Sequence, residues 1–407
     1  MNDAPRQRMF NIYLIAAEES GDALGAALAR ALAERGHGAL RLAGVGGRAM
    51  AAAGIVSPFP IDELSIIGLT AIPRRLPLIL RRIREIADAV VAAKPDALVI
   101  IDSPDFTHRV ARQVRRRAPS IPIIDYVSPT VWAWRPGRAR AMRSYVDCVL
   151  AILPFEPATH LRLGGPPCVY VGHPLIERIA ELRPNAEETA RRQSNPPLVL
   201  DLPGSRSSEI NHLLAIFGAA IARVADRAGA MELVLPTMPH LLAQVREKIV
   251  GWPVQPRVVV KPAEKWAAFR TARAALAASG TVTLELALSG VPAVVAYRLS
   301  LIEEVVLRLM RSREISTIVL TNLVAGEKII PELLQRDCTP EKLAEALVPL
   351  IADTKERRRQ VEAFQRLDAI MAIGTATPSS QAAAIVLDVA SRGRRDLASI
   401  NAIPFAG

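Results

Sequence analysis

The most constraining feature of this sequence is a repeated alternation between short, continuous apolar runs and longer segments with helical periodicity. In the first half, strands are predicted by apolar runs at residues 10–17, 97–102, 121–127 and 148–153. A helix is predicted at residues 21–35, because Leu24, Leu28 and Leu32 recur at every fourth position before Gly36. Strands that are apolar throughout are typical of parallel sheets covered on both faces. The alternation therefore predicts an α/β fold of parallel sheets with right-handed crossovers.

A polar, proline-rich stretch interrupts this rhythm between residues 181 and 197. The rhythm then resumes with predicted strands at residues 198–202, 232–235, 257–260, 274–278 and 293–297. We therefore expect two Rossmann-like domains, at residues 1–182 and 198–355, joined by a linker at residues 183–197. Helices at residues 356–390 are candidates for packing back on the N-terminal domain, and residues 391–407 are expected to form a weakly ordered tail.

The composition is that of a chain that buries a large core, since 50% of its 407 residues are hydrophobic and 22% are charged. Its three cysteines are scattered and form no CxxC pair, which argues against a disulfide framework or a zinc site and fits a reducing compartment. The net charge of +11 favours an anionic partner. Aromatic residues make up 4% of the chain, and no basic recognition helix is evident, so a membrane surface or a phosphorylated ligand ranks above nucleic acid.

Two apolar stretches imitate membrane-directed segments. The run at residues 10–17 is followed at once by Glu18 and Glu19, where a signal peptide would need small residues, so we interpret it as a first strand. The stretch at residues 274–297 contains one charge, Glu285, but is interrupted at residues 279–281 and 289–292. A membrane span should be a continuous apolar helix. Strand, short helix and strand is the better interpretation, with Glu285 on the helix.

The first candidate for chemistry follows the first predicted strand and contains Glu18, Ser20 and Asp22. In open parallel sheets, ligands bind at the carboxyl ends of the strands, where a following helix offers free backbone N–H groups. Ser20 and Asp22 can equally be helix caps. Capping alone accounts less well for two carboxylates, those of Glu18 and Asp22, at such an edge.

A second candidate, Asp102, ends the predicted strand at residues 97–102 and is expected to point into a cleft between the domains. A carboxylate at a strand end is a good candidate for a general base. The alternative is a turn aspartate that accepts hydrogen bonds from nearby N–H groups. Asp105, three residues later, is expected to cap the next helix.

The most unusual segment carries Trp132 and Trp134, two of the four tryptophans of the chain, just after a predicted strand. In a loop they would offer flat contacts to a sugar or an acyl chain, and as structural residues they would pack a domain edge. The arginines that follow suit phosphate groups, at positions Arg135, Arg138, Arg140 and Arg143.

Two turns in the second half combine a strand, a glycine and a helix start. The first contains Gly204 and Arg206, where the glycine would let a diphosphate approach the backbone and the arginine could bind it. The second contains Ser279, Gly280 and Thr281, and Glu285 lies one turn further on, where it could accept hydrogen bonds from ribose hydroxyls. The glycines at residues 44–47 lack the GxGxxG spacing of a dehydrogenase. The sequence has no Walker A lysine and no spacing for metal ligands, so no metal and no cofactor are expected.

Two further features have an ordinary and a functional interpretation. A basic amphipathic helix surrounds an apolar stripe of Ile79, Leu80, Ile83 and Ala87, with Pro77 expected in its first turn; its arginines are Arg74, Arg75, Arg81, Arg82 and Arg84. Such a helix can lie on an anionic membrane or can be a domain helix with a solvated basic face. His173 follows a predicted strand and is either a structural histidine or part of the site.

In this order along the chain, these motifs resemble those of the lipid-A-disaccharide synthases, which are inverting glycosyltransferases of the GT-B fold. The matching segments run from about residue 10 to residue 335, at residues 18–22, 101–106, 126–134, 153–156, 172–174, 202–206, 279–285 and 322–326. The tryptophan segment is specific to the family, whereas the glycine turns are shared across the wider fold. The resemblance implies two Rossmann-like domains whose parallel sheets face a central cleft.

The resemblance also implies a reaction. The donor would be UDP-2,3-diacylglucosamine and the acceptor 2,3-diacylglucosamine 1-phosphate (lipid X), whose 6-hydroxyl attacks the anomeric carbon to give a β(1→6) disaccharide and UDP. By this resemblance Asp102 and Ser20 are catalytic, with Asp102 as the base. The first domain would hold the acceptor, and the candidates for substrate binding are Glu18, Asp22, Trp132, Trp134, His173 and Asn322. UDP would contact Gly204, Arg206, Ser279, Gly280, Thr281 and Glu285. The expected location is the cytoplasmic face of the inner membrane, with a homodimer as one option and no nucleic acid partner.

The sequence departs from the family pattern at several positions. Ala17 and Glu19 replace a glycine and a threonine beside Ser20, and Thr321 replaces the proline before Asn322. The family's acidic residue in its Gly-x-x-Glu pattern is missing at residues 68–71, and Glu327-Lys328 replaces an Arg-Glu pair. Two other classes of protein also remain open: a different UDP-sugar enzyme of this fold, such as a 2-epimerase or an N-acetylglucosaminyltransferase, and a non-catalytic protein that binds anionic lipids.

Overall fold

The chain forms two compact units. The computed structural model describes residues 9–36, 38–64, 72–299 and 317–394, with the backbone alone at residues 72–75. Unit 1 combines Met1–Ile176 with Ile373–Gly407, and unit 2 is Glu177–Ala372. The departure from the family pattern at residues 68–71, the side chains of Arg74 and Arg75, and the tail beyond residue 394 lie outside this description.

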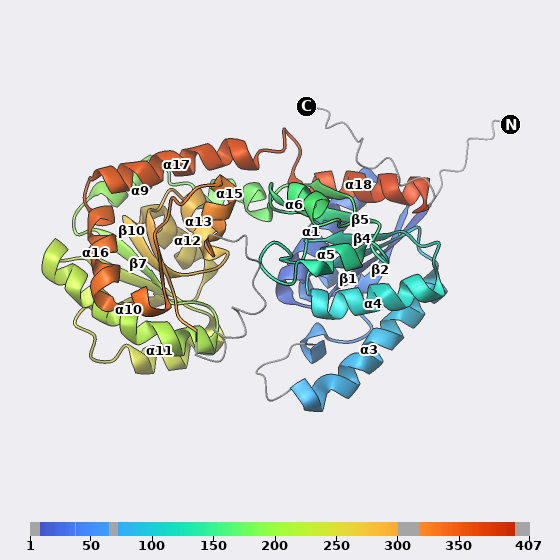
Figure 1. Ribbon diagram of the computed structural model, residues 1–407, viewed down its shortest axis with the longest axis horizontal. Helices are drawn as coiled ribbons and strands as arrows, with labels where there is room; N and C mark the ends of the chain where they lie inside the picture. The colour runs from blue at the N-terminus through green and yellow to red at the C-terminus, as the bar shows by residue number, and fades with distance from the viewer. Residues whose placement is uncertain (1–8, 37, 65–71, 300–316, 395–407) are drawn as a thin grey trace. The chain divides into compact units, whose positions relative to one another are not determined.

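The described strands of unit 1 form one parallel sheet in the order β2-β1-β3-β4-β5-β6 (Figure 1). Its strands are β1 Phe10–Ala16, β2 Leu40–Val45, β3 Ala97–Ile101, β4 Ile123–Tyr126, β5 Cys148–Ala151 and β6 Cys168–Tyr170. All five residues of β3 are buried, as expected for a central parallel strand covered on both faces. The four strands predicted in this half are confirmed, each one to three residues shorter than its apolar run.

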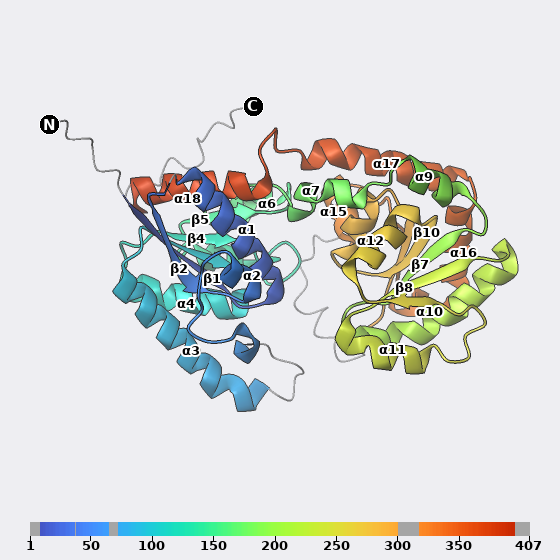
Figure 2. The ribbon, with the colours of Figure 1, turned by 180° about the vertical axis from the view of Figure 1, so that it is seen from behind.

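Helices cover both faces of this sheet. They are α1 Glu19–Arg35, α2 Arg48–Ala52, α3 Ile72–Ala93, α4 Pro104–Arg117, α5 Gly137–Met142, α6 Glu156–Arg162, α7 Pro174–Glu177 and α18 Pro378–Arg392. One core cluster joins the sheet to α1 and α18, and a second joins its other face to α3 and α4. Figures 1 and 2 show these pairs on opposite sides of β1 and β3. The C-terminal helix α18 thus completes the unit formed by the N-terminal half.

Unit 2 repeats this plan with a parallel sheet in the order β12-β11-β10-β7-β8-β9. Its strands are β7 Leu198–Leu202, β8 Glu232–Pro236, β9 Arg257–Val259, β10 Ala274–Ala278, β11 Ala293–Tyr297 and β12 Glu332–Leu334. The described helices are α8 Ile179–Leu182, α9 Ala186–Gln193, α10 Ser207–Ala228, α11 Leu242–Lys248, α12 Pro262–Thr271, α13 Val282–Leu288, α15 Leu320–Ala325, α16 Pro340–Ile351 and α17 Lys355–Met371. The interpretation of residues 274–297 as strand, helix and strand is confirmed, with Glu285 on α13.

Both sheets contain a topological switch point, where neighbouring strands send their connections to opposite sides. In unit 1 it lies between β1, whose chain leads outward to β2, and β3, whose chain leads to β4. In unit 2 it lies between β7 and β10. Ligands of open α/β sheets bind in the crevice at such points, outside the carboxyl ends of the strands. The topology therefore selects one edge in each unit as the place to look for a site.

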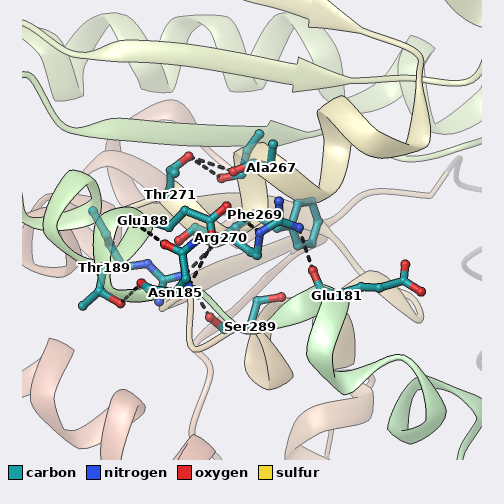
Figure 3. Close-up of polar contacts among 11 residues, drawn as sticks. Glu181, Asn185, Glu188, Thr189, Ala267, Phe269, Arg270, Thr271 and Ser289 are labelled. Atoms are coloured by element: carbon teal, nitrogen blue, oxygen red, sulfur yellow. Dashed lines mark hydrogen bonds and ion pairs between the residues drawn. The ribbon is translucent and has the colours of Figure 1, made fainter.

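The stretch expected to be a linker, residues 183–197, contains the short helix α9. Asn185 begins it with a capping box, in which its Oδ1 accepts from the backbone N of Glu188 at 2.8 Å and its own N donates to Glu188 Oε2 at 3.0 Å. Figure 3 shows Arg270 of α12 between Glu188 and the backbone carbonyl of Glu181, at 2.7 Å from each acceptor. These contacts hold the stretch on unit 2, so unit 2 begins before its first strand.

The basic helix α3 behaves mainly as a domain helix. Ile83 and Ala87 of its apolar stripe are buried in the core, whereas Leu80 is 38% exposed. Its helix begins at Ile72, so Pro77 is the sixth residue, and the prediction that it lies in the first turn is wrong. The structure has no described helix long and apolar enough to cross a membrane.

Candidate active site

The carboxyl ends of β1, β3 and β4 form one row at the switch point of unit 1. Ala16 is in register with Ile101, which is in register with Tyr126, so the residues that follow them lie side by side. Gly21 of α1 packs tightly on this row, because a Cβ atom there would lie 3.1 Å from the carbonyl oxygen of Ile101. This close approach brings the Ser20 hydroxyl to 2.8 Å from Asp102 Oδ2, to which it donates a hydrogen bond.

Asp102 is held in an unusual conformation. Asp102, Ser103 and Val127 have φ angles of +53°, +47° and +81°, in the left-handed region that side chains other than glycine rarely adopt. Each such residue costs on the order of 1–3 kcal/mol, and such strain clusters at functional sites. The second oxygen of Asp102, Oδ1, accepts from the backbone N of Ser103 at 2.7 Å. Asp102 therefore has the backbone contact of a turn aspartate together with the contact to Ser20.

The carboxylate of Asp22 does not cap its own helix. It is 5% exposed and accepts three backbone hydrogen bonds at the start of α2, from Gly47, Ala49 and Met50, at 2.7, 2.8 and 3.0 Å. Glu18 occupies the N-cap position of α1, where no side chain makes a capping hydrogen bond. The alternative that Ser20 and Asp22 are caps of the first helix is thus wrong. Asp22 instead ties α1 to α2, whereas Glu18 remains exposed at the strand row.

The tryptophan segment is attached to a buried glutamate. Trp132 Nε1 lies 3.3 Å from Glu156 Oε1, to which it donates, and Glu156 Oε2 accepts from the backbone N of Leu153 at 3.1 Å. Trp132 also packs edge-on against Phe155, whereas Trp134 is 38% exposed. Burial raises the pKa of the Glu156 carboxyl to about 8, against the opposing effect of these two hydrogen bonds. Trp132 is therefore a packing residue, and Trp134 is the one available for a ligand.

His173 has the structural role that the sequence left open. It is 5% exposed, and its Nδ1 accepts a hydrogen bond from the backbone N of Leu175 at 3.1 Å. Burial lowers its pKa to about 4, so the imidazole is neutral at physiological pH. A second buried histidine, His160, lies 2.8 Å from the Ser128 hydroxyl beneath the tryptophan segment.

Unit 2 has a pocket of about 330 Å³ at its own switch point. It is lined by residues that follow β7, β8 and β10 and by side chains of α10, α12 and α13. All six residues predicted to contact UDP line this one pocket: Gly204, Arg206, Ser279, Gly280, Thr281 and Glu285. The structure therefore brings together two turns that are more than 70 positions apart in the sequence.

The two glycines of this pocket have backbone conformations that favour glycine, with φ angles of +117° at Gly204 and +153° at Gly280. A Cβ atom at Gly204 would also collide with Glu209, whose Oε2 accepts from the backbone N of Ser205 at 2.9 Å. Glu209 thus fixes the turn at the start of α10. The Arg206 side chain is 75% exposed, with one contact of 3.3 Å to Glu209 Oε1, so its guanidinium remains accessible to a ligand.

Lys265 is a pocket residue that sequence reasoning missed. It comes from α12, and its Nζ forms an ion pair of 2.7 Å with Glu285 Oε2. Its ammonium group also lies 4.2 Å from the centroid of the Trp266 ring. A lysine within a helical run carries no signal of its own, and only the packing of α12 against the pocket reveals it. Glu285 Oε1 has no hydrogen-bond partner among the described residues, which leaves it available for a ligand hydroxyl.

Asn322, by contrast, is turned inward. It is 1% exposed, its Oδ1 accepts from the backbone N atoms of Ile329 and Ile330 at 3.0 and 2.9 Å, and its Nδ2 donates to the carbonyl of Ile330 at 2.9 Å. These bonds close the turn after α15, which contains the altered Glu327-Lys328 pair. Both ends of the Asn322 amide therefore form hydrogen bonds within the protein.

Within the described ranges, no group of three or more histidine, cysteine, aspartate or glutamate side chains is arranged to hold a metal ion. The three cysteines are free thiols, and burial raises the pKa of Cys148 to about 12.

Solved structures similar to this chain share its two-unit architecture. A putative UDP-N-acetylglucosamine 2-epimerase from Listeria monocytogenes aligns with a TM-score of 0.60 at 12% identity, over 93% of this chain and 94% of its own. Acinetobacter baumannii MurG aligns with a TM-score of 0.54 at 15% identity, over 93% of this chain and 99% of its own. At this identity the likeness concerns the fold, and it confirms the prediction of a GT-B-type α/β fold with two parallel sheets.

Sequence comparison is more specific. The family model described as lipid-A-disaccharide synthetase matches residues 12–386. The lipid-A-disaccharide synthase of Bradyrhizobium diazoefficiens is 62% identical over 384 residues, which cover 94% of this chain and 97% of the relative. That of Rhodospirillum centenum is 42% identical over 94% of this chain and 95% of the relative. The chain therefore belongs to the lipid-A-disaccharide synthase family.

Proposed function

We propose that this protein transfers 2,3-diacylglucosamine from its UDP derivative to the 6-hydroxyl of 2,3-diacylglucosamine 1-phosphate. The acceptor oxygen forms the new bond to the anomeric carbon of the donor. The bond from that carbon to the β-phosphate oxygen breaks, and UDP leaves with its electron pair. The hydroxyl proton passes to a base of the protein. Membership in the lipid-A-disaccharide synthase family, over nearly the whole chain, supports this assignment.

The observation that carries the mechanism is the contact between Ser20 and Asp102 at the switch point of unit 1. The hydrogen bonds from Ser20 Oγ and from the backbone N of Ser103 orient the two carboxylate oxygens of Asp102. A carboxylate held in this way is prepared to accept the proton of an attacking hydroxyl. We assign Asp102 as the general base and Ser20 as the group that orients it. Glu18 and Trp134, which are exposed near the same edge, are assigned to acceptor contacts.

The pocket of unit 2 supports the other half of the reaction, the departure of UDP. The start of α10, a helix of 22 residues, lies at the pocket with the positive end of its dipole, and Arg206 adds an accessible guanidinium. Both stabilise a diphosphate more strongly as its charge grows, which lowers the barrier for the departing group. Glu285 is assigned to the ribose hydroxyls, with Lys265 holding its orientation through their ion pair.

Some residues predicted to bind substrate are better suited to an indirect role. Asp22, His173 and Asn322 are each at most 5% exposed and use their polar atoms in hydrogen bonds to the backbone. Trp132 is attached to Glu156. We propose that these four residues shape the loops around the substrates.

We further propose that the protein acts at the cytoplasmic face of the inner membrane, because both substrates carry acyl chains and the chain has a net charge of +11. Sedimentation with anionic and with neutral vesicles tests this part, and equal binding to both would contradict it.

A homodimer is proposed as the active form. Light scattering at the assay concentration tests it, and a monomeric mass with full activity would contradict it.

The decisive experiment measures UDP release from UDP-2,3-diacylglucosamine in mixed micelles that contain EDTA, with and without the acceptor. We expect release that requires the acceptor and a new disaccharide 1-phosphate by mass spectrometry. Release that does not need the acceptor would indicate a hydrolase or an epimerase-like enzyme. No release from the acylated donor, together with turnover of UDP-N-acetylglucosamine, would overturn the proposed substrate.

A further inference from the structure

Unit 1 contains a second pocket whose chemistry the proposed mechanism does not use. It has a volume of about 530 Å³ and lies between α4 and the start of α5. Its lining consists of four arginines, one carboxylate, one histidine and small residues: Arg109, Arg112, Arg135, Arg138, Asp105, His108, Pro104, Gly137 and Ala141. Four guanidinium groups face one carboxylate, so the pocket has a marked excess of positive charge and suits an anion.

Part of this positive charge is not neutralised by the protein. Arg138 forms an ion pair with Asp105 at 2.9 Å. The prediction that Asp105 caps α4 is wrong, because Ser103 is the N-cap residue and no side chain makes a capping hydrogen bond there. Arg109 and Arg135 are exposed, and the side chain of neither forms a hydrogen bond or ion pair with any residue within the described ranges. Like charges repel one another, so four arginine side chains in one pocket raise its electrostatic energy unless an anion binds there.

The fourth arginine is oriented from beneath by a buried chain of polar contacts. Arg112 donates to the Tyr145 hydroxyl at 3.1 Å, and Tyr145 lies 3.0 Å from His108 Nδ1. His108 Nε2 lies 3.1 Å from Asp125 Oδ2, and both of these side chains are at most 3% exposed. Tyr145 can donate to His108 Nδ1, whereas His108 Nε2 and the Asp125 carboxylate lie close together without the geometry of a hydrogen bond. The guanidinium of Arg112 also stacks over the Tyr145 ring, at 4.6 Å from its centroid, so its position is well defined.

The pocket begins immediately beside the proposed base. Pro104 and Asp105 line it, and they follow Asp102 within three residues. Their Cα atoms lie at most about 11 Å from that of Asp102, because consecutive Cα atoms are about 3.8 Å apart. In a hexopyranose the 6-hydroxyl and the anomeric substituent project from C5 and C1, the two carbons that flank the ring oxygen. One sugar can therefore place the 6-hydroxyl at Asp102 while its anomeric substituent lies further along α4.

We propose that this arginine pocket binds the phosphate monoester on the anomeric carbon of the acceptor. The inference rests on the proposed function, since it identifies the part of the acceptor that lies beyond the reacting hydroxyl. A phosphate monoester carries close to two negative charges and three acceptor oxygens, which arginines bind through paired N–H groups. The donor has its diphosphate inside a nucleotide, for which unit 2 has its own pocket. The arginine pocket would thus select an acceptor with a free phosphate and orient it.

The test uses the double variant Arg109→Gln/Arg135→Gln, which removes two exposed charges that have no described partner. The matched control is Arg30→Gln/Arg116→Gln, since these arginines are also exposed, lie on α1 and α4 of unit 1 and do not line the pocket. We expect the pocket variant to raise KM for the 1-phosphate acceptor at least about tenfold, as the loss of charge-assisted hydrogen bonds implies. KM for the donor and all constants of the control variant should change less than about twofold.

An acceptor that lacks the phosphate distinguishes phosphate recognition from a general loss of fit. With 2,3-diacylglucosamine as acceptor, wild type and pocket variant should have the same KM. The difference in KM seen with the 1-phosphate acceptor should therefore disappear. If the variant is impaired equally with both acceptors, the pocket does not read the phosphate and the inference is overturned. The same holds if the control variant is impaired as much as the pocket variant.

Equilibrium binding separates this inference from the proposed function. Binding of 2,3-diacylglucosamine 1-phosphate in mixed micelles is measured without donor, so it is informative even if no transfer occurs. Loss of this binding in the pocket variant would support the pocket, and unchanged binding would overturn it. Vesicles of phosphatidic acid, compared with phosphatidylcholine, test a lipid headgroup as the source of the phosphate. Weaker binding of the variant to phosphatidic acid, with an unchanged acceptor KM, would assign the pocket to the membrane and overturn its role for the acceptor.

Discussion

The candidate sites of the two units lie at equivalent points of the same topology but consist of different chemical groups. At the switch point of unit 1, the site consists of charged and polar side chains, with Asp102 between Ser20 and Ser103 and an arginine pocket beside it. At the switch point of unit 2, the turns are built around Gly204 and Gly280, and the side chains of Arg206, Lys265 and Glu285 complete the pocket. Parallel sheets with helices on both faces are thus the common frame, and the turns after the strands decide the chemistry.

The difference fits the chemical tasks that we propose for the two units. A proton acceptor must be held in one orientation, and unit 1 does this with two hydrogen bonds and with three residues in a left-handed conformation. A nucleotide diphosphate needs several donors at close range, which glycines provide by letting the backbone approach. Changes in the two units should therefore affect different kinetic constants, and the predictions below test that separation.

The largest effect is expected for Asp102→Asn. The amide keeps the size of the carboxylate, and its oxygen can still accept from Ser103 or Ser20, but it cannot take up the proton of the acceptor. We expect kcat to fall at least about 100-fold, as for the loss of a general base, with unchanged affinity for UDP. Single-turnover kinetics and calorimetric titration with UDP measure the two quantities.

Asp62→Asn is the matched control, because Asp62 is an exposed aspartate of unit 1 that is not among the residues following β1, β3 and β4. It should leave both quantities unchanged. Near-normal turnover of Asp102→Asn would remove Asp102 as the base. A large loss of UDP affinity in this variant would contradict the separation of tasks between the units.

The reciprocal effect is expected for Arg206→Ala in unit 2. Its guanidinium is 75% exposed at the start of α10, so its removal should leave the fold intact and remove a charged donor to the diphosphate. We expect the Kd of UDP to rise about 30-fold, in the range found for hydrogen bonds to charged groups, with an unchanged KM for the acceptor. Arg246→Ala, at an exposed arginine of α11, is the control. A rise in the acceptor KM of Arg206→Ala, without loss of UDP affinity, would reverse the assignment of the two units.

The sequence predicts the frame and the turns of both units well. Apolar runs such as residues 198–202, 274–278 and 293–297 coincide with β7, β10 and β11, because a strand buried on both faces is apolar at nearly every position, with Asp201 of β7 as an exception. The UDP-contact residues were also predicted to belong together, and they line one pocket. Their signal is local, since a glycine turn after a strand can be recognised within about ten residues.

Contacts between distant side chains could not be predicted in the same way. Asp22 was expected either to cap its own helix or to face a ligand, and it instead binds the start of α2, more than 20 positions away. Lys265 reaches the nucleotide pocket from a helix with no distinctive motif. The chain from Asp125 to Arg112 joins β4, α4 and the loop after α5. Such contacts depend on how the helices pack on the sheet, and the spacing of residues in the sequence does not indicate this packing.

A smaller effect, on stability, is expected from the buried carboxyl groups of the two units. Burial raises the pKa of Glu156 to about 8, whereas an unfolded glutamate has a pKa of about 4.3. Between these values unfolding releases a proton, so the free energy of unfolding of unit 1 falls as the pH rises, by about 1.4 kcal/mol per pH unit from this group. The contribution is fully present below the lower value and is lost once the pH passes the higher one.

Glu156→Gln should remove this slope from unit 1, because the amide does not titrate. It should also be less stable than wild type at low pH, since its NH₂ group would face one of the two donors, Trp132 Nε1 or the backbone N of Leu153. Urea unfolding is followed by the fluorescence of Trp132 and Trp134, in a background in which Trp252 and Trp266 of unit 2 are phenylalanine. Burial also raises the pKa of Asp201 in β7, so the free energy of unfolding of unit 2 should also fall as the pH rises. This fall should persist in Glu156→Gln. An unchanged slope for unit 1 in the variant would mean that Glu156 is ionised in the folded protein, and that Trp132 is then held by a charged carboxylate.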